Sequence, residues 1–328
     1  MAYLLGLDAG NTKTIALVAR ADGTVLGAGR AGCGDIYGAG SPGAALAEVE
    51  RAVAQALDAA SLRPSDLAAG AFSMAGADWP EDFALLEGAL RARGLGRTVA
   101  VYNDAIGALR AGSPDGTGVV VACGTGAAIG ARSADGRIWH TSFWQEPQAA
   151  GELAARALRA VYRAELGIDP PTALTGRVLQ YFGLTTVEAV LHAMTARGRA
   201  RPPGVHGLAR VLLDTAEEGD PTARRIVLAH GTALGDYALV AARKVGLAGQ
   251  DFTLVLAGGI FRHPAPVLRE ALVARVREGA PGARPVSARL EPAAGALLLA
   301  LEQAGTTVGE ALLARLEATL PPPAFFAT

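Results

Sequence analysis

The chain has 328 residues, more than one hydrophobic core usually supports, so two domains are expected. Its 30 Lys and Arg residues balance 31 Asp and Glu residues, which excludes the basic excess of proteins that bind nucleic acid or anionic membranes. The two cysteines, Cys33 and Cys123, lack metal-ligand spacing and indicate neither a disulfide framework nor a zinc site.

The longest late apolar run, residues 293–301, is too short to span a bilayer, and the start has no basic n-region of a signal peptide. We therefore expect a cytoplasmic protein whose partner is a small molecule, with no nucleic acid and no membrane as partner.

The first 112 residues alternate between strand and helix patterns, which is typical of an α/β layer. Strands are predicted at 3–7, 14–20, 25–29, 68–74 and 98–102, and helices at 42–60, 81–93 and from Asp104 onward. The turn cluster Ser-Pro-Asp-Gly at 113–116 is the best boundary. The predicted domains are therefore 1–112 and a larger one over 113–307.

The second half is mainly helical. Helix patterns dominate 148–244, a buried strand is predicted at 252–256, and more helix follows from 264 to the end. The three prolines at 321–323 are expected to end regular structure.

Two stretches of the chain look like copies of one another. Residues 7–14 and 121–126 each read as a strand that enters a Gly/Thr turn, followed by a second strand and an Asp-Gly turn. Thr12 precedes Asp22 by the same ten residues that separate Thr125 from Asp135. Glycine in such turns permits positive φ and close approach, so backbone N–H groups can surround a phosphate. Two such turns on opposed halves predict a phosphate clamp.

Four elements occur in the order found in the sugar kinase, heat-shock chaperone and actin superfamily. They are the Asp-x-Gly-x-Thr-x-Thr pattern at 8–14, Asp104 after a strand, the Gly-Thr-Gly turn at 124–126 and the strand end at 256–259. More closely, the chain resembles the N-acetylglucosamine kinase-like members of the BadF/BadG/BcrA/BcrD-type ATPase family. Residues 75–78 and 217–221 are part of this closer resemblance.

This resemblance implies an α/β fold of two ribonuclease H-like domains, as in actin-like ATPases, with ATP in the cleft between them. The last helix, 308–320, would pack back on the first domain. The implied activity is an ATP-dependent carbohydrate kinase that uses Mg²⁺. Its acceptor would be an amino sugar such as N-acetylglucosamine or a related hexose, and a homodimer is one possible assembly.

The resemblance also implies roles for individual residues. Asp104 would be the catalytic general base that accepts the proton of the sugar hydroxyl. A plain helix N-cap is an equally good interpretation of Asp104 from the sequence alone. Asp8 would orient Mg²⁺ through water. The implied nucleotide-binding residues are Gly10, Asn11, Thr12, Lys13, Thr14, Gly124, Thr125, Gly126, His206, Gly258, Gly259 and Arg262.

On the acceptor side, Asp35 stands where the family usually has Asn, and Trp144 either stacks on a sugar face or lies in the core. The family's acidic Asp-Glu pair is replaced by alanines at 149–150, so its usual carboxylate contact to the sugar is missing. Glu146 or Glu152 are the alternatives that would supply it.

Two other functions remain open. One is an ATPase that activates a partner enzyme through an iron–sulfur cluster. Cysteine usage argues against it, since no second cysteine follows Cys123 and Cys33 lies in the other half. The other is a non-catalytic regulator of the same fold that binds sugar or nucleotide. A dehydrogenase is disfavoured because no Gly-x-Gly-x-x-Gly turn joins the first strand to a helix.

Overall fold

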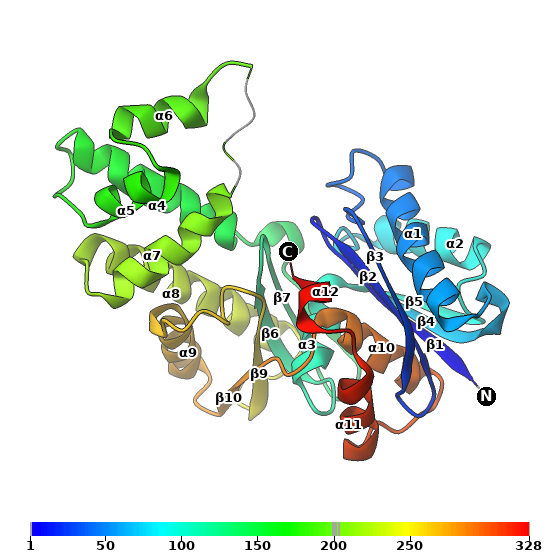
Figure 1. Cartoon of the computed structure of the whole chain (residues 1–328). Coiled ribbons are helices and arrows are strands. Elements are labelled where there is room, and N and C mark those ends of the chain that lie inside the picture. Colours follow the sequence, from blue (N-terminus) through cyan, green and yellow to red (C-terminus); the bar gives the residue numbers. More distant parts are fainter. Residues whose placement is uncertain (1, 199–201, 203, 328) are drawn as a thin grey trace.

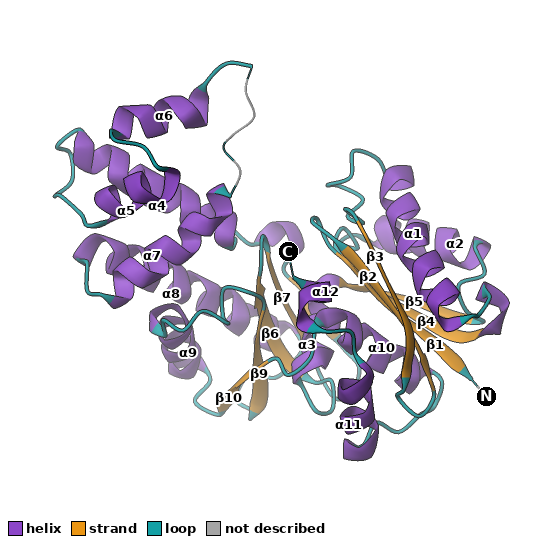
Figure 2. Ribbon diagram, in the orientation of Figure 1, coloured by secondary structure: helices purple, strands orange, loops and turns teal. Residues whose placement is uncertain are grey.

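The computed structural model describes residues 2–198, 202 and 204–327. It contains two five-stranded sheets of the same topology (Figures 1 and 2), with strand orders β3-β2-β1-β4-β5 and β10-β9-β6-β7-β8. The first sheet contains β1 (Tyr3–Ala9), β2 (Thr14–Arg20), β3 (Val25–Ala31), β4 (Leu67–Met74) and β5 (Thr98–Asn103). The second sheet contains β6 (Gly118–Cys123), β7 (Ala127–Arg132), β8 (Ile138–His140), β9 (Phe252–Ala257) and β10 (Ala283–Ser287).

The structure confirms the predicted duplication. In each sheet the first three strands are antiparallel and the last two run parallel to the first. The two Asp-Gly turns also match, because Gly23 and Gly136 have positive φ values of 90° and 87°. The strand at β10 was not predicted, although the duplication makes it the counterpart of β5.

The helices cover the outer faces of both sheets and fill the space between them. They are α1 (Pro42–Ala60), α2 (Pro80–Ala92), α3 (Asp104–Gly112), α4 (Ala150–Glu165), α5 (Leu174–Phe182), α6 (Val187–Thr195), α7 (Leu208–Glu217), α8 (Pro221–Lys244), α9 (Val267–Gly279), α10 (Pro292–Gln303), α11 (Glu310–Thr319) and α12 (Pro323–Phe326). Helices α1 and α2 pack on one face of the first sheet, and α10 packs on the other. Helix α3 packs between the two sheets (Figure 1).

The alternation of side chains along β1 orients the first candidate site residue. Leu5 and Leu7 are buried in the core under α1 and α2, whereas Leu4 is buried on the α10 face. Gly6 lies on the α10 face as well, where an added Cβ would come within 2.2 Å of the backbone nitrogen of Leu297. Since side chains alternate along a strand, Asp8 at the end of β1 is on this same inner face.

Most predicted elements are confirmed to within one or two residues, and two details are wrong. Regular structure does not end at the prolines, because the short helix α12 begins at Pro323. The predicted helical stretch from 264 to the end is also interrupted, because strand β10 lies between α9 and α10. The helical character predicted for 148–244 is confirmed by α4 to α8, and residues 199–201 and 203 within it lie outside the described residues. In the described part of the chain, no helix combines the length and apolar character needed to cross a membrane.

Candidate active site

The two duplicated turns meet between the sheets. Thr12 follows β1 and Thr125 follows β6, and their Oγ1 atoms form a hydrogen bond of 3.3 Å. Within the turns, the Gly10 N–H donates to the carbonyl of Lys13 at 2.9 Å, and the Gly124 N–H donates to the carbonyl of Gly126 at 2.9 Å. Residues 113 positions apart are thus brought together by the fold.

The glycines of these turns are surrounded by open space. A Cβ added at Gly124 or Gly126 would have no protein atom within 4 Å, and at Gly10 the nearest atom would be 3.5 Å away. None of the three has positive φ, so positive φ is not the reason for glycine at these positions. Protein packing therefore does not explain glycine here, whereas close approach of a ligand would.

The two glycines after β9, Gly258 and Gly259, have different surroundings. Gly258 has φ +92°, and a Cβ there would come within 2.3 Å of the Cys123 carbonyl oxygen. The Ile260 N–H also donates to this carbonyl at 3.1 Å, which fixes the turn against the end of β6. Gly259 has no atom within 4 Å of its Cβ position and resembles the turn glycines instead.

Three predicted nucleotide residues make specific contacts in the first hairpin. Lys13 donates to the carbonyl of Phe326, and burial lowers its pKa. Asn11 accepts a hydrogen bond from the Cys33 thiol at 3.4 Å. Thr14 is fully buried and its Oγ1 donates to the Gly32 carbonyl at 2.9 Å, so its side chain is engaged within the protein and its nucleotide contact stays a prediction.

Two further predicted residues lie at the edge of this region. Arg262 pairs with Glu291, which precedes α10, at 3.0 Å. His206 is exposed and packs against Gly151 at the start of α4. The neighbouring Ala150 N–H donates to the Gly124 carbonyl at 3.3 Å, which connects this helix to the second turn.

Asp8 and Asp104 lie at corresponding ends of β1 and β5 and influence each other. The pKa of Asp8 is raised to about 7, mainly by burial and then by the charge of Asp104, whereas Lys13 opposes this shift. Burial also raises the pKa of Asp104 to about 7, with added contributions from Asp78 and Asp35. A carboxyl group with a pKa near 7 can both accept and release a proton at neutral pH.

The N-cap interpretation of Asp104 is wrong. Asn103 is the N-cap of α3, because its side-chain oxygen accepts a hydrogen bond from the Ala105 N–H at 3.1 Å. Asp104 is the first residue of the helix, and its carboxylate is not needed as the cap.

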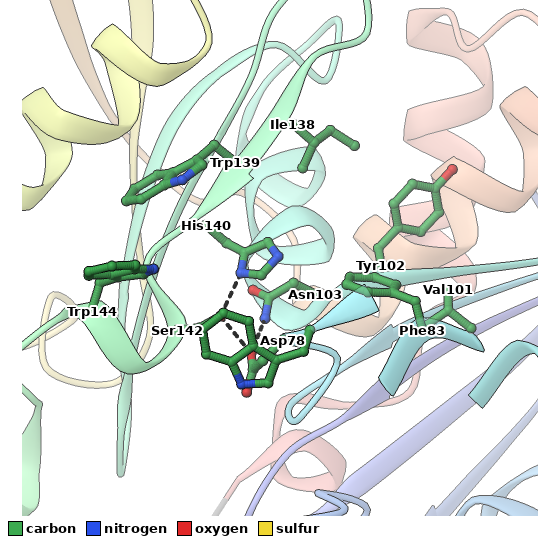
Figure 3. Close-up of a pocket in the computed structure, with 11 residues that line it drawn as sticks. Asp78, Phe83, Val101, Tyr102, Asn103, Ile138, Trp139, His140, Ser142 and Trp144 are labelled. Atoms are coloured by element: carbon green, nitrogen blue, oxygen red, sulfur yellow. Dashed lines mark hydrogen bonds between the residues drawn. The ribbon is translucent and has the colours of Figure 1, made fainter. Parts of the chain in front are cut away.

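A cavity of about 440 Å³ opens beside Asn103, and Figure 3 shows residues of both halves around it. Asp78 follows β4, and its Oδ1 accepts hydrogen bonds from Asn103 Nδ2 at 3.0 Å and Ser142 Oγ at 2.6 Å. Ser142 also lies 2.5 Å from Nδ1 of His140. The lining residues are Asp78, Trp79, Phe83, Val101, Tyr102, Asn103, Ile138, Trp139, His140, Ser142 and Trp144.

The sequence analysis gave no role to Asp78, Asn103, His140 or Ser142. A usable signal was present for Asp78, since β4 and β5 are parallel neighbours with Met74 opposite Asn103. Polar residues that follow two such strands meet at one edge of the sheet. Ser142 and His140 carry no such signal, because they reach the cavity from the other half of the chain.

The predicted acceptor residues reach the cavity region from two loops. Asp35 is half-buried, its Oδ1 accepts from the Tyr37 N–H at 2.9 Å, and it lies against Gly76, two residues before Asp78. The side chain of Trp144 lines the cavity and is 68% exposed, so the core interpretation of Trp144 is wrong.

The replaced acidic pair lies inside the protein. Ala149 is fully buried and Ala150 is 8% exposed. Glu152 accepts from the Gln148 N–H at 2.6 Å and pairs with Arg156, and its contact to the sugar stays a prediction. Glu146 is exposed.

The donor groups fit a magnesium ion that is held mainly by a nucleotide. Among the described residues, no three His, Cys, Asp or Glu side chains are placed to hold a metal ion. Magnesium usually keeps several waters and takes only one or two carboxylates together with substrate phosphates. Asp8, beside the open phosphate turns, matches this pattern.

Comparisons with known proteins identify the family of the chain. A model of the BadF/BadG/BcrA/BcrD ATPase family matches residues 5–300. The N-acetyl-D-glucosamine kinase of Dictyostelium discoideum is 25% identical over 311 residues, which cover 90% of this chain and 97% of that protein. The N-acetylmuramic acid/N-acetylglucosamine kinase of Clostridium acetobutylicum is 24% identical over 271 residues, covering 80% and 87%.

Solved structures show the same fold. A protein from Chromobacterium violaceum assigned as an N-acetylglucosamine kinase has a TM-score of 0.66 and 26% identity, with 91% of this chain and 99% of that chain covered. A glucokinase from Streptomyces griseus has a TM-score of 0.57 at 18% identity, with 92% and 100% covered. The fold is therefore the α/β fold of sugar kinases and actin-like ATPases, as expected.

Proposed function

The chain belongs to the BadF/BadG/BcrA/BcrD ATPase family, and from this premise we propose that it is an ATP-dependent kinase of an amino sugar. The observation that carries the proposal is the contact between the duplicated turns, with Thr12 and Thr125 joined at 3.3 Å beside Asp8 and Asp104. Open space over the turn glycines suits phosphate groups that approach the backbone. The similarity to N-acetylglucosamine kinases supports a sugar as acceptor.

In this proposal Asp104 is the general base. The acceptor hydroxyl donates a hydrogen bond to the carboxylate and passes its proton to Asp104 as the oxygen attacks the γ-phosphorus of ATP. The bond between that phosphorus and the β–γ bridging oxygen breaks, and ADP leaves with the electron pair. A base is most effective when its pKa lies near the working pH, and burial raises the pKa of Asp104 to about 7.

Three groups would prepare the phosphates for transfer. The Thr12 and Thr125 turns would hold them through backbone N–H groups, and Lys13 would add positive charge from the first hairpin. Asp8 would hold Mg²⁺ through water, and the bound ion would neutralise charge on the β- and γ-phosphates.

The substitution Asp104→Asn tests the assignment of the base. We expect turnover to fall by roughly 10²-fold or more with ATP affinity kept, because Asn preserves shape but cannot accept the proton. Asp251→Asn is the control, since Asp251 is exposed and its ion-pair partner among the described residues is the exposed Arg284. Sugar-dependent ADP release measures both variants. Turnover of Asp104→Asn within a few-fold of the parent would reject Asp104 as the base.

A further inference from the structure

A strap of residues 320–327 follows α11 and returns to the first sheet (Figure 1). It is anchored just before it starts, because the Val25 N–H at the beginning of the edge strand β3 donates to Thr319 Oγ1 at 3.0 Å. Three consecutive prolines at 321–323 restrict its backbone, and the third of them begins α12. The strap is therefore a stiff connection with a fixed start.

The strap is held to the first half of the chain by a buried aromatic ring. Phe326 is 6% exposed and belongs to the same buried cluster as Ile15 of β2 and Leu297 of α10. Its ring meets the ring of Phe325 edge to face, with the two centroids 5.4 Å apart. Because burial of an aromatic side chain is a strong apolar anchor, α12 has a defined position beside β2 and α10.

Two cations of the first sheet bind the carbonyl groups of α12. The last carbonyls of a helix have no partner within the helix, and positive charge is favourable beside them. Arg30 Nη1, from β3, donates to the Phe325 carbonyl at 2.7 Å. Lys13, from the turn between β1 and β2, donates from Nζ to the Phe326 carbonyl. The residue whose ring anchors the strap thus presents its backbone oxygen to the lysine of the first phosphate turn.

This carbonyl orders the ammonium group of Lys13 close to the charges of the candidate active site. Burial lowers the pKa of Lys13, and the charges of Glu291 and Asp8 oppose this shift. The ammonium group therefore lies within electrostatic reach of the carboxylate proposed for Mg²⁺. A lysine in an exposed turn samples many rotamers, and it loses this freedom when it binds a phosphate. The strap limits that freedom before a nucleotide arrives.

We propose that Phe326 is a positioning residue of the nucleotide site, because its buried ring holds the carbonyl that orders Lys13 for the phosphates of ATP. The inference rests on the proposed function, in which Lys13 contacts the phosphates, and adds a residue 313 positions away to that site. Phe326 acts through Lys13 and does not touch the nucleotide. The ordering of one side chain in advance favours ATP binding and leaves sugar binding unaffected.

The test measures the Kd of ATP by titration and the KM of the sugar. Phe326→Ala should weaken ATP binding by about 5- to 10-fold, the scale of the rotamer freedom that one lysine regains, with the sugar KM little changed. Phe326→Leu keeps an apolar anchor and should stay within about twofold of the parent. Leu86→Ala is the control for lost stability, since Leu86 is fully buried in a different cluster under α2, and it should bind ATP as the parent does.

A double variant shows whether the effect passes through the lysine. Lys13→Met removes the ammonium group and should weaken ATP binding by about 10-fold or more, the scale of a charged hydrogen bond. When Phe326→Ala is added to Lys13→Met, the Kd should change by less than about twofold, because the group that Phe326 positions is already absent. An equal loss in both backgrounds would show a structural role independent of Lys13 and overturn the inference.

The remaining outcomes also decide the matter. Tighter ATP binding by Phe326→Ala would show that the strap withholds Lys13 from the phosphates, and an effect no larger than that of Leu86→Ala would show no specific role, so either overturns the inference. Unchanged affinity in Lys13→Met would contradict both the proposed phosphate contact and the inference. If thermal unfolding shows that Phe326→Ala does not fold, the smaller truncation Phe326→Val is titrated in its place. The titration needs no sugar, so failure to phosphorylate any sugar would contradict the kinase alone.

Discussion

At the residue scale, the raised pKa of Asp104 determines how activity depends on pH. A base must be ionised to accept a proton, so kcat/KM should fall as the pH drops below about 7, by up to about tenfold per pH unit. A pH–rate profile of sugar phosphorylation between pH 5.5 and 8.5 measures this. A flat profile down to pH 5.5 would show that no group of raised pKa is needed.

The stability of the protein should depend on pH in the opposite direction. The folded-state pKa values of Asp8 and Asp104, about 7, lie above the ordinary value of 3.8. Their contribution to stability is therefore fully present below about pH 4 and lost as the pH rises through about 7. We expect Asp104→Asn to raise the unfolding temperature of the nucleotide-free protein at pH 8 and to raise it less at pH 5, where only part of this penalty has developed.

Comparison of parent and variant at each pH isolates this effect. The lowered pKa values of His140 and His230 act in the opposite direction between pH 5 and 7, but they are present in both proteins. An unfolding temperature that Asp104→Asn lowers equally at both pH values would contradict the raised pKa and indicate a structural role for the carboxylate.

The glycines of the site should separate into ligand-facing and structural positions. Gly126→Val should reduce ATP affinity by roughly 10-fold or more, about 1.4 kcal/mol, with little change in unfolding temperature, because its Cβ meets no protein atom within 4 Å. Gly258→Ala should instead lower the unfolding temperature, since its Cβ would lie 2.3 Å from the Cys123 carbonyl and its φ is +92°. Nucleotide titration and thermal unfolding distinguish them. Unchanged ATP affinity in folded Gly126→Val would reject the clamp.

At the element scale, the close packing of α3 on α10 depends on glycine. A Cβ on Gly295 would come within 1.9 Å of the Gly107 carbonyl oxygen, so the helix backbones touch at this point. Gly295→Ala should therefore destabilise the protein by about 3 kcal/mol through overpacking. The control is Gly88→Ala on α2, which has open space and should stabilise by about 0.5 to 1 kcal/mol. Denaturant unfolding measures both, and equal effects of the two changes would contradict this packing.

The elements that the sequence predicts well are those with strong periodicity or turn signals. Strands β1, β2 and β9 are apolar runs bounded by Gly or Asp. The start of α1 is marked by the N-cap Ser41 followed by a proline. Strand β10 carries Pro285 and alternates poorly, because it is a sheet edge. Only the internal duplication could have predicted it.

The candidate site was predictable where it follows strand ends and not where it depends on contacts between loops. Asp8 and Asp104 follow strands, so their placement comes from local patterns. The hydrogen bond of Ser142 to Asp78 joins residues 64 positions apart and has no local signal. The burial of Thr14 under the Gly32 loop likewise depends on how that loop returns to the hairpin.

At the scale of the whole molecule, the inner helices connect the two sheets around the cleft. Helix α3 follows the first sheet in the chain and packs against β6, β7 and β9 of the second. Helix α10 comes after the second sheet and packs against β1 and β4 of the first. Because α3 packs on the second sheet and α10 on the first, the two halves share an inner layer of helices. The domain boundary at residue 112 stays a prediction. The two Gly/Thr turns, one from each half, meet at the hydrogen bond between Thr12 and Thr125.

Transfer of the γ-phosphoryl group of ATP to a sugar oxygen is the most direct test of a kinase at this site. With ATP labelled at the γ-phosphorus and an amino sugar present, we expect the label in a sugar phosphate, formed in the same amount as ADP. Without the sugar, label release should be slow, because the proposed Asp104 base then has no sugar hydroxyl to deprotonate. Label found only in inorganic phosphate, at the same rate with and without sugars, would contradict the kinase and indicate an ATPase.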